Sequence, residues 1–260
     1  LSDAEALSFH LVEQHLQGLL PESTASDLLP YFRTAREKLS SSTTRSPLGA
    51  WSRRIRVVDP QQPFLPPKVD RVVRGVVTSA LLRSRQLEIR YRAPWSRKAG
   101  QHRIHPLGLV QYGPAFYLCV RFFEYPAPRM IAMHRIERAE IVDKAVQPPA
   151  GFDLDRWIAE GAFGFGELGK PIRLDLSFRE NAGDFLLESP LSADQRASQD
   201  GGVLRVQATV MDTRRLRWWI MSFGPRAVVN GPKALRDDIA RQHRQAAEQY
   251  AEASREAALA

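Results

Sequence analysis

Arginine, histidine and tyrosine side chains recur along residues 86–142, a strand-rich stretch, and they are suited to binding an anion. Residues 86–92 alternate apolar and charged positions, which is the period of a half-buried strand. Further short β-type runs follow, and each carries a cationic or phenolic side chain. Guanidinium groups offer planar, bidentate donors to phosphate, so several of them in one cleft would bind a phosphate-bearing ligand. The candidate ligand-binding residues are Tyr91, Arg103, His105, Tyr117, Arg129, His134 and Arg135.

The spacing of these residues bears on whether they share one face. Arg103 and His105 are two positions apart, so on an extended strand they face the same side. Tyr117 lies between two apolar residues, which would face the other way. For each residue alone, a structural interpretation is equally good: the tyrosines would belong to a barrel core, and Arg135 would pair with a carboxylate such as Glu137.

A second basic and aromatic cluster lies at residues 214–219. On a helix, Trp219 would turn inward while Arg214, Arg217 and Trp218 lie nearer the surface. We favour core tryptophans beside solvated arginines. The alternative is that Arg214 and Arg217 form a second wall of the ligand site.

The order of these residues resembles the WYL domain, a small SH3/Sm-like β-barrel of bacterial transcription regulators. Phe116 stands where the family has the Trp of its name. Residues 194–250 resemble the C-terminal extension that often follows this barrel, and residues 1–40 resemble the helical linker that often precedes it. The matching pieces are Ile89-x-Tyr91, Arg103-x-His105-Pro106-Leu107, Tyr117-Leu118, Arg129, His134-Arg135-Ile136, Thr213-x-x-Leu216-x-x-Trp219 and Ser222-Phe223-Gly224.

The resemblance implies the ligand-sensing and dimerisation module of a bacterial transcription regulator. Its barrel would bind single-stranded DNA or an oligonucleotide and would control DNA binding by a separate N-terminal domain, a winged helix-turn-helix. The chain begins with Leu1, directly in a helical pattern, so we expect that such a segment precedes it. The alternative is a nucleic-acid-processing enzyme of phosphodiesterase or nuclease type. No nucleophile, close acid pair or Cys/His spacing supports that reading, so we expect no catalytic residue, metal or cofactor.

Charge agrees with a polyanionic partner. The 260-residue chain has a formal net charge of +8 and a pI near 10.0, and Glu88 is the single acid among many arginines between residues 71 and 105. No apolar run approaches the length of a membrane span, and no signal peptide is evident. The lone cysteine, Cys119, fits a reducing compartment, so we expect a cytoplasmic protein without membrane contact. We also expect a homodimer, because a two-fold dimer suits a regulator of palindromic DNA.

The predicted fold is α+β. We expect a helical linker and dimerisation region over residues 1–58, the WYL barrel over 59–147, a linker over 148–170, and a ferredoxin-like α+β domain over 171–260. Periodicity predicts a helix that begins at a capping box formed by Ser2 and Glu5, further helices over 26–39 and 69–82, and a strand over 55–58. The spacing Gly164-x-Gly166-x-x-Gly169 matches a dinucleotide-loop pattern, but Pro171 follows it, so we favour a plain loop.

Within these domains the pattern predicts individual strands and helices. Barrel strands are expected at about 86–92, 101–112, 115–123, 128–133 and 137–142, with a helical turn near Met133. After a short helix around 155–159, strands are expected at 172–178, 203–211 and 227–229, and helices at about 180–188, 213–222 and 232–255.

Overall fold

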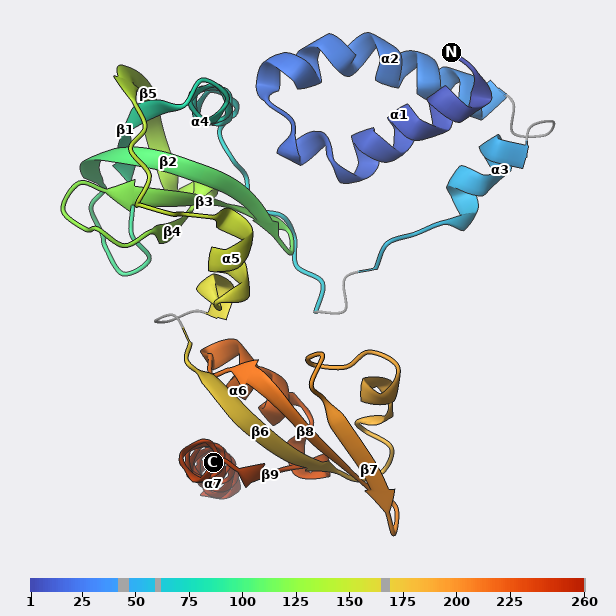
Figure 1. Cartoon of the computed structure of the whole chain (residues 1–260), viewed down its shortest axis with the longest axis vertical. Coiled ribbons are helices and arrows are strands. Elements are labelled where there is room, and N and C mark those ends of the chain that lie inside the picture. The colour runs from blue at the N-terminus through green and yellow to red at the C-terminus, as the bar shows by residue number, and fades with distance from the viewer. Residues whose placement is uncertain (42–46, 59–61, 165–168, 260) are drawn as a thin grey trace. The chain divides into compact units, whose positions relative to one another are not determined.

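A computed structural model describes residues 1–41, 47–58, 62–164 and 169–259. The chain divides into two compact units, Leu1–Phe152 and Asp153–Ala260. Figure 1 shows helices followed by a curved sheet in the first unit and a second sheet with its helices in the other. The expected α+β class is confirmed, and each unit is described by itself below.

The first unit begins with helices α1 (Asp3–His15), η1 (Gln17–Leu19), α2 (Glu22–Ser41) and α3 (Pro47–Arg54). The expected capping box starts α1: the Ser2 hydroxyl accepts from the backbone N–H of Glu5, and the Glu5 carboxylate accepts from that of Ser2. Buried Ala6, Ala35 and Leu39 join α1 to α2.

The predicted strand at 55–58 is wrong. These residues form no regular element, and Val57 and Val58 are 76% and 82% exposed. Their β-branched composition favours an extended backbone, but a strand also needs a neighbour to receive its hydrogen bonds, and none lies beside them among the described residues. Helix α3, just before them, was not predicted.

The barrel follows, covered by α4 (Arg71–Leu82). Its strands are β1 (Arg85–Tyr91), β2 (Gly100–Tyr112), β3 (Ala115–Phe122), β4 (Arg129–Ala132) and β5 (Ile136–Ala145), with the short helix η2 (Met133–Arg135) between the last two. They form one five-stranded antiparallel sheet in the order β4-β3-β2-β1-β5. Each expected strand and the expected turn are therefore confirmed, with small changes at their ends.

Alternation along the strands explains the barrel core. Leu87, Ile89 and Ile104 are almost completely buried, and they pack with Val73 and Val77 of α4. Helix α4 forms despite its valines because its apolar face is buried and because the Asp70 side chain accepts from the N–H of Val73 at 3.0 Å, capping the helix.

The second unit contains α5 (Leu154–Ala159), η3 (Ala162–Gly164), β6 (Pro171–Phe178), η4 (Asp184–Leu187), β7 (Arg196–Asp200), β8 (Val203–Met211), α6 (Arg214–Ser222), η5 (Gly224–Arg226), β9 (Ala227–Gly231) and α7 (Lys233–Leu259). Its four-stranded sheet has the order β7-β8-β6-β9. With α6 and α7 beside it, this antiparallel arrangement has the ferredoxin-like strand order.

Two features of this unit differ from expectation. The helix expected at about 180–188 is the short 3-10 turn η4, so the first crossover is reduced. Strand β7 was not predicted, because all its residues are exposed and carry no apolar alternation. Of the glycine pattern, Gly166 lies outside the described residues, so its loop interpretation stays a prediction.

Candidate anion-binding face of the barrel

The barrel sheet has one face turned to α4 and the core and one turned away, here called the outer face. Strand register assigns residues to it, because directly paired residues on antiparallel strands project to the same side. Arg103 of β2 pairs with Glu88 of β1, and His105 pairs with Arg121 of β3. Their neighbour Ile104 is buried in the core. Arg103, His105 and Arg121 therefore share the outer face, as the spacing of the first two predicts.

His105 is the most constrained residue of this face. Its side chain is fully buried, and its Nδ1 accepts from the backbone N–H of Gln147 at 3.0 Å. Arg121 donates from Nε to the carbonyl oxygen of the same residue at 2.9 Å. The segment after β5 is thereby tied to the outer face. Because Nδ1 accepts, the neutral ring carries its proton on Nε2, and this buried N–H has no acceptor among the described residues.

Burial and nearby charge both disfavour the protonated form of this imidazole. Burial lowers the pKa of His105, and the positive charges of Arg121 and Arg103 lower it further. Arg103 has a weak partner of its own: its Nε lies 4.0 Å from the Glu88 carboxylate and makes no hydrogen bond to the described residues, although it is buried. Two buried donors of this face are thus left without hydrogen-bond acceptors among the described residues, and the oxygens of an anion are the acceptors that suit them.

Aromatic residues continue this face along β3. Tyr117 pairs with Val110 and with Ala132, on the side opposite the core residue Leu118, as its flanking residues predict. It is half-buried, and its ring meets that of Tyr112 edge-on with centroids 6.4 Å apart. On the other side of Arg103, a groove of about 150 Å³ runs over β2, β1 and β5. It is lined by Glu88, Ile89, Arg90, Gln101, Arg138 and Glu140.

The remaining candidates lie elsewhere. Tyr91 packs against the barrel core. Arg129 pairs with the core residue Val120 at the start of β4, and its guanidinium carbon lies 3.9 Å from the ring centroid of Tyr125.

The turn η2 carries His134 and Arg135. Burial, followed by the charge of Arg135, lowers the pKa of His134, whose Nδ1 is buried without a partner among the described residues. Glu137, considered above as a partner of Arg135, instead pairs with Arg90 and Arg92. The register thus groups Arg103, His105 and Tyr117 on one face and places the other candidates apart from it.

In the basic and aromatic cluster at residues 214–219, Arg217 has a structural role. Arg217 forms ion pairs with Asp212 and, at 2.9 Å, with Asp238, and these carboxylates raise its pKa. Arg214 is exposed and, with Arg217, lines a pocket of about 440 Å³ that Trp218 also borders.

Sequence reasoning missed Arg121 and Gln147. Arg121 could have been predicted from the sequence, because it follows Tyr117 by four residues on the same strand and so lies on the same face. Gln147 was not, because its backbone meets His105 across 42 positions of sequence.

The described residues contain no group of three or more His, Cys, Asp or Glu side chains placed to hold a metal ion. Nor do they include a helix with the length and hydropathy to cross a membrane. Burial raises the pKa of the Cys119 thiol to about 12, which makes it an inert core residue.

Two family models match the chain: a WYL domain over residues 73–141 and a WCX domain over residues 170–247. No curated protein matches it significantly in sequence. Among solved structures, it is similar to the proteasome accessory factor B/C (PafBC) of Arthrobacter aurescens, with 23% identity and a TM-score of 0.31 over 67% of this chain and 26% of that one. A CRISPR Cas-related protein shows 13% identity and a TM-score of 0.47 over 69% of this chain and 51% of that one, so the chain spans only part of either protein. The chain therefore carries a region that matches a WYL domain, followed by one that matches a WCX domain.

Proposed function

We propose that this chain is the ligand-sensing module of a transcription regulator and that the outer face of its barrel binds a nucleic-acid-derived anion, single-stranded DNA or an oligonucleotide. The presence of both a WYL and a WCX domain supports a regulatory module. One observation carries the assignment of the face: the buried Nε2–H of His105 has no acceptor among the described residues and lies near two arginines.

Phosphate oxygens match this arrangement chemically. A phosphodiester offers several acceptors and a negative charge, whereas Arg103, His105 and Arg121 offer donors with little compensating charge nearby. The half-buried rings of Tyr117 and Tyr112, on the same face, give a nucleobase an aromatic surface for stacking. A single-stranded ligand presents phosphates and unstacked bases together, so it uses both parts of the face.

The proposal keeps several wider expectations. Tyr91, Arg129, His134 and Arg135 remain candidate contacts for a ligand longer than the face. The four-part division of the chain, homodimerisation, a cytoplasmic location, the absence of enzymatic activity and control of a separate DNA-binding domain belong to the proposal as well.

Fluorescence anisotropy with a labelled single-stranded oligonucleotide tests the ligand. We expect saturable binding that weakens with salt and weaker binding of a duplex of the same sequence, because the bases of a duplex cannot reach the tyrosines. Gel analysis of the same mixtures tests the alternative function. Conversion of the oligonucleotide into defined shorter products would replace the sensor with a nucleic-acid-processing enzyme.

Light scattering at micromolar concentration tests the oligomeric state. We expect a homodimer through the N-terminal helices or the C-terminal domain, because two-fold symmetry suits a regulator of palindromic DNA. A monomeric mass would show that these 260 residues do not dimerise by themselves.

A further inference from the structure

The short segment Gly18–Glu22, which runs from η1 to the first residue of α2, makes two separate contacts, one with β3 and one with α4; it is called the elbow here. At its first residue, the backbone lies directly on an aromatic ring: a Cβ added to Gly18 would stand 2.2 Å from Cζ of Phe116. Only glycine allows this approach unless the ring moves, and Phe116 of β3 is itself packed against the barrel core.

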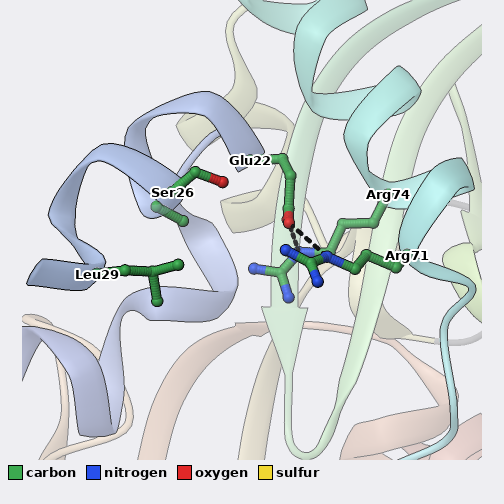
Figure 2. Close-up of a pocket in the computed structure, with 6 residues that line it drawn as sticks. Glu22, Ser26, Leu29, Arg71 and Arg74 are labelled. Atoms are coloured by element: carbon green, nitrogen blue, oxygen red, sulfur yellow. Dashed lines mark hydrogen bonds and ion pairs between the residues drawn. The ribbon is translucent and has the colours of Figure 1, made fainter. Parts of the chain in front are cut away.

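The last residue of the elbow makes the second contact, with α4. The Glu22 carboxylate lies 3.0 Å from Nε of Arg71 and 3.9 Å from Nε of Arg74, and the Glu22 backbone N–H donates to the hydroxyl of buried Thr78 at 3.3 Å. Figure 2 shows both guanidinium groups converging on this carboxylate, in a pocket of about 340 Å³ that Ser26 and Leu29 of α2 also line.

The two contacts reach different elements, because the arginines around Glu22 come from α4 (Figure 2) whereas Phe116 belongs to β3. The strand contact lies close to the proposed site. Phe116 is followed by Tyr117, whose ring is on the outer face, so one strand presents consecutive side chains to the elbow and to the ligand. Packed cores shift as units, so a ligand that displaces β3 also displaces the surface on which Gly18 rests.

We propose that the elbow couples the ligand state of the barrel to the α1–α2 hairpin, with Gly18 and Phe116 as the contact that transmits the shift and Glu22 as the anchor on α4. This inference rests on the proposed function, because it assigns the regulation of that same face. Ligand binding at β3 changes how strongly the elbow holds α2 against the barrel. Helix α2 then passes this change to the part of the chain that precedes the barrel.

The test follows amide hydrogen exchange of α2 by mass spectrometry, with and without a 5′-phosphorylated single-stranded oligothymidylate, while anisotropy follows binding of the same probe. In Gly18→Ala we expect exchange in the first turns of α2 to rise roughly tenfold without probe, because the new methyl lifts the elbow from the ring. In the double variant Gly18→Ala/Phe116→Leu, the smaller leucine side chain leaves room for the new methyl group, so slow exchange of α2 is restored. Gly75→Ala is the matched control, since its Cβ would meet Glu22 Cγ at an ordinary 3.7 Å.

Probe binding supplies the coupling itself. In the wild type we expect the bound probe to change α2 exchange by about fivefold or more, and in Gly18→Ala this response disappears while the Kd stays within about threefold. If the probe binds and α2 does not respond, the coupling is refuted although the barrel site stands. If the probe does not bind, the proposed function and the ligand coupling both fail. Wild-type exchange in Gly18→Ala would overturn the elbow contact whatever the probe does.

Discussion

The barrel and the C-terminal domain hold their arginines in opposite ways. In the C-terminal domain, Arg205 donates to both carboxylate oxygens of Asp175, at 2.9 and 2.6 Å, and Arg217 lies between two aspartates. On the outer face of the barrel, Arg103 reaches Glu88 only at 4.0 Å, and Arg121 donates a hydrogen bond to a backbone carbonyl. The C-terminal domain pairs these two arginines with carboxylates, whereas the outer face holds Arg103 and Arg121 without a carboxylate at hydrogen-bond distance among the described residues.

The same contrast appears in the buried polar atoms. Asp175 also accepts from Gln207 and Asn230, and its hydrogen bond with Arg205 holds its pKa well below the usual range. Among the described residues, every buried side-chain nitrogen or oxygen without a hydrogen-bond partner lies in the first unit, including those of His105 and His134. Because leaving a buried donor without a hydrogen bond costs stability, the nitrogens of Arg103 and His105 support the proposal that the barrel is the domain that binds the ligand.

The largest expected effect lies in the C-terminal domain. Arg217→Ala leaves Asp212 and Asp238 close together without their shared cation, so we expect the C-terminal domain to lose about 2–4 kcal/mol of unfolding free energy. Urea unfolding followed by tryptophan fluorescence measures this loss. Arg214→Ala, an exposed change on the same helix, is the control and should cost no more than about 0.5 kcal/mol. Equal losses in both variants would contradict the ion-pair clamp.

In the barrel the corresponding change should affect affinity. Arg103→Ala and Arg121→Ala each remove a guanidinium near the orphan donor of His105, and we expect oligonucleotide binding to weaken by about 1.5–3 kcal/mol, roughly tenfold to a hundredfold. Arg205→Ala removes an equal charge from the C-terminal domain and should leave affinity nearly unchanged. Similar weakening in all three variants would mean that net charge, and not this face, determines binding. Arg129→Ala shows whether the ligand extends to the start of β4.

The contrast also shows what the sequence could predict. Alternation of residues such as Leu87 and Ile89 with charged neighbours predicts the barrel strands, because a strand with one buried face has an apolar residue at every second position. The order and spacing of Arg103, His105 and Tyr117 likewise predict a shared face. Strand β7 carried no such signal, since an exposed edge strand is held by backbone hydrogen bonds to β8.

The environment of each candidate could not be predicted in this way. That His105 is buried follows from the return of residue 147, far along the chain, over the outer face. That Arg217 is a structural clamp follows from Asp238 on α7, whereas the local sequence shows only a basic and aromatic cluster. Both features depend on tertiary contacts, which the hydrophobic periodicity of the local sequence does not indicate.

Stability against pH should separate the two domains. Because burial lowers the pKa of His105, the unfolded chain takes up a proton below pH about 6.5 while the folded barrel does not, so barrel stability falls as pH drops through this range. The slope is at most about 1.4 kcal/mol per pH unit for one histidine, and His134 adds to it with the same sign. Asp175 and Asp194 have lowered pKa values, so the stability that they contribute is lost only below about pH 4.

Denaturant titrations at pH 7.5, 6.5 and 5.5 measure this difference, with amide exchange assigning each transition to its domain. His105→Gln should flatten the barrel's response, because the amide keeps an acceptor for the N–H of Gln147 and does not titrate. A C-terminal domain that weakens in parallel with the barrel over this range would show that the histidines are not the cause.

The smallest effect is expected at Arg138, on the groove of the outer face. Its ion pair with Glu140 is 3.3 Å long but both side chains are largely exposed, 73% and 68%, so Arg138→Ala should change stability by less than about 0.5 kcal/mol. Arg138 nevertheless lines the groove beside Arg90, where an extended ligand leaving Arg103 would pass. If a ligand phosphate contacts Arg138, Arg138→Ala should reduce the slope of log affinity against log salt concentration by about one. The reduction should be similar for every oligonucleotide sequence. Anisotropy titrations over a range of salt concentrations measure this slope, and Arg236→Ala on α7, another exposed arginine, is the matched control. An unchanged slope for Arg138→Ala would confine the ligand to the Arg103–Tyr117 part of the face.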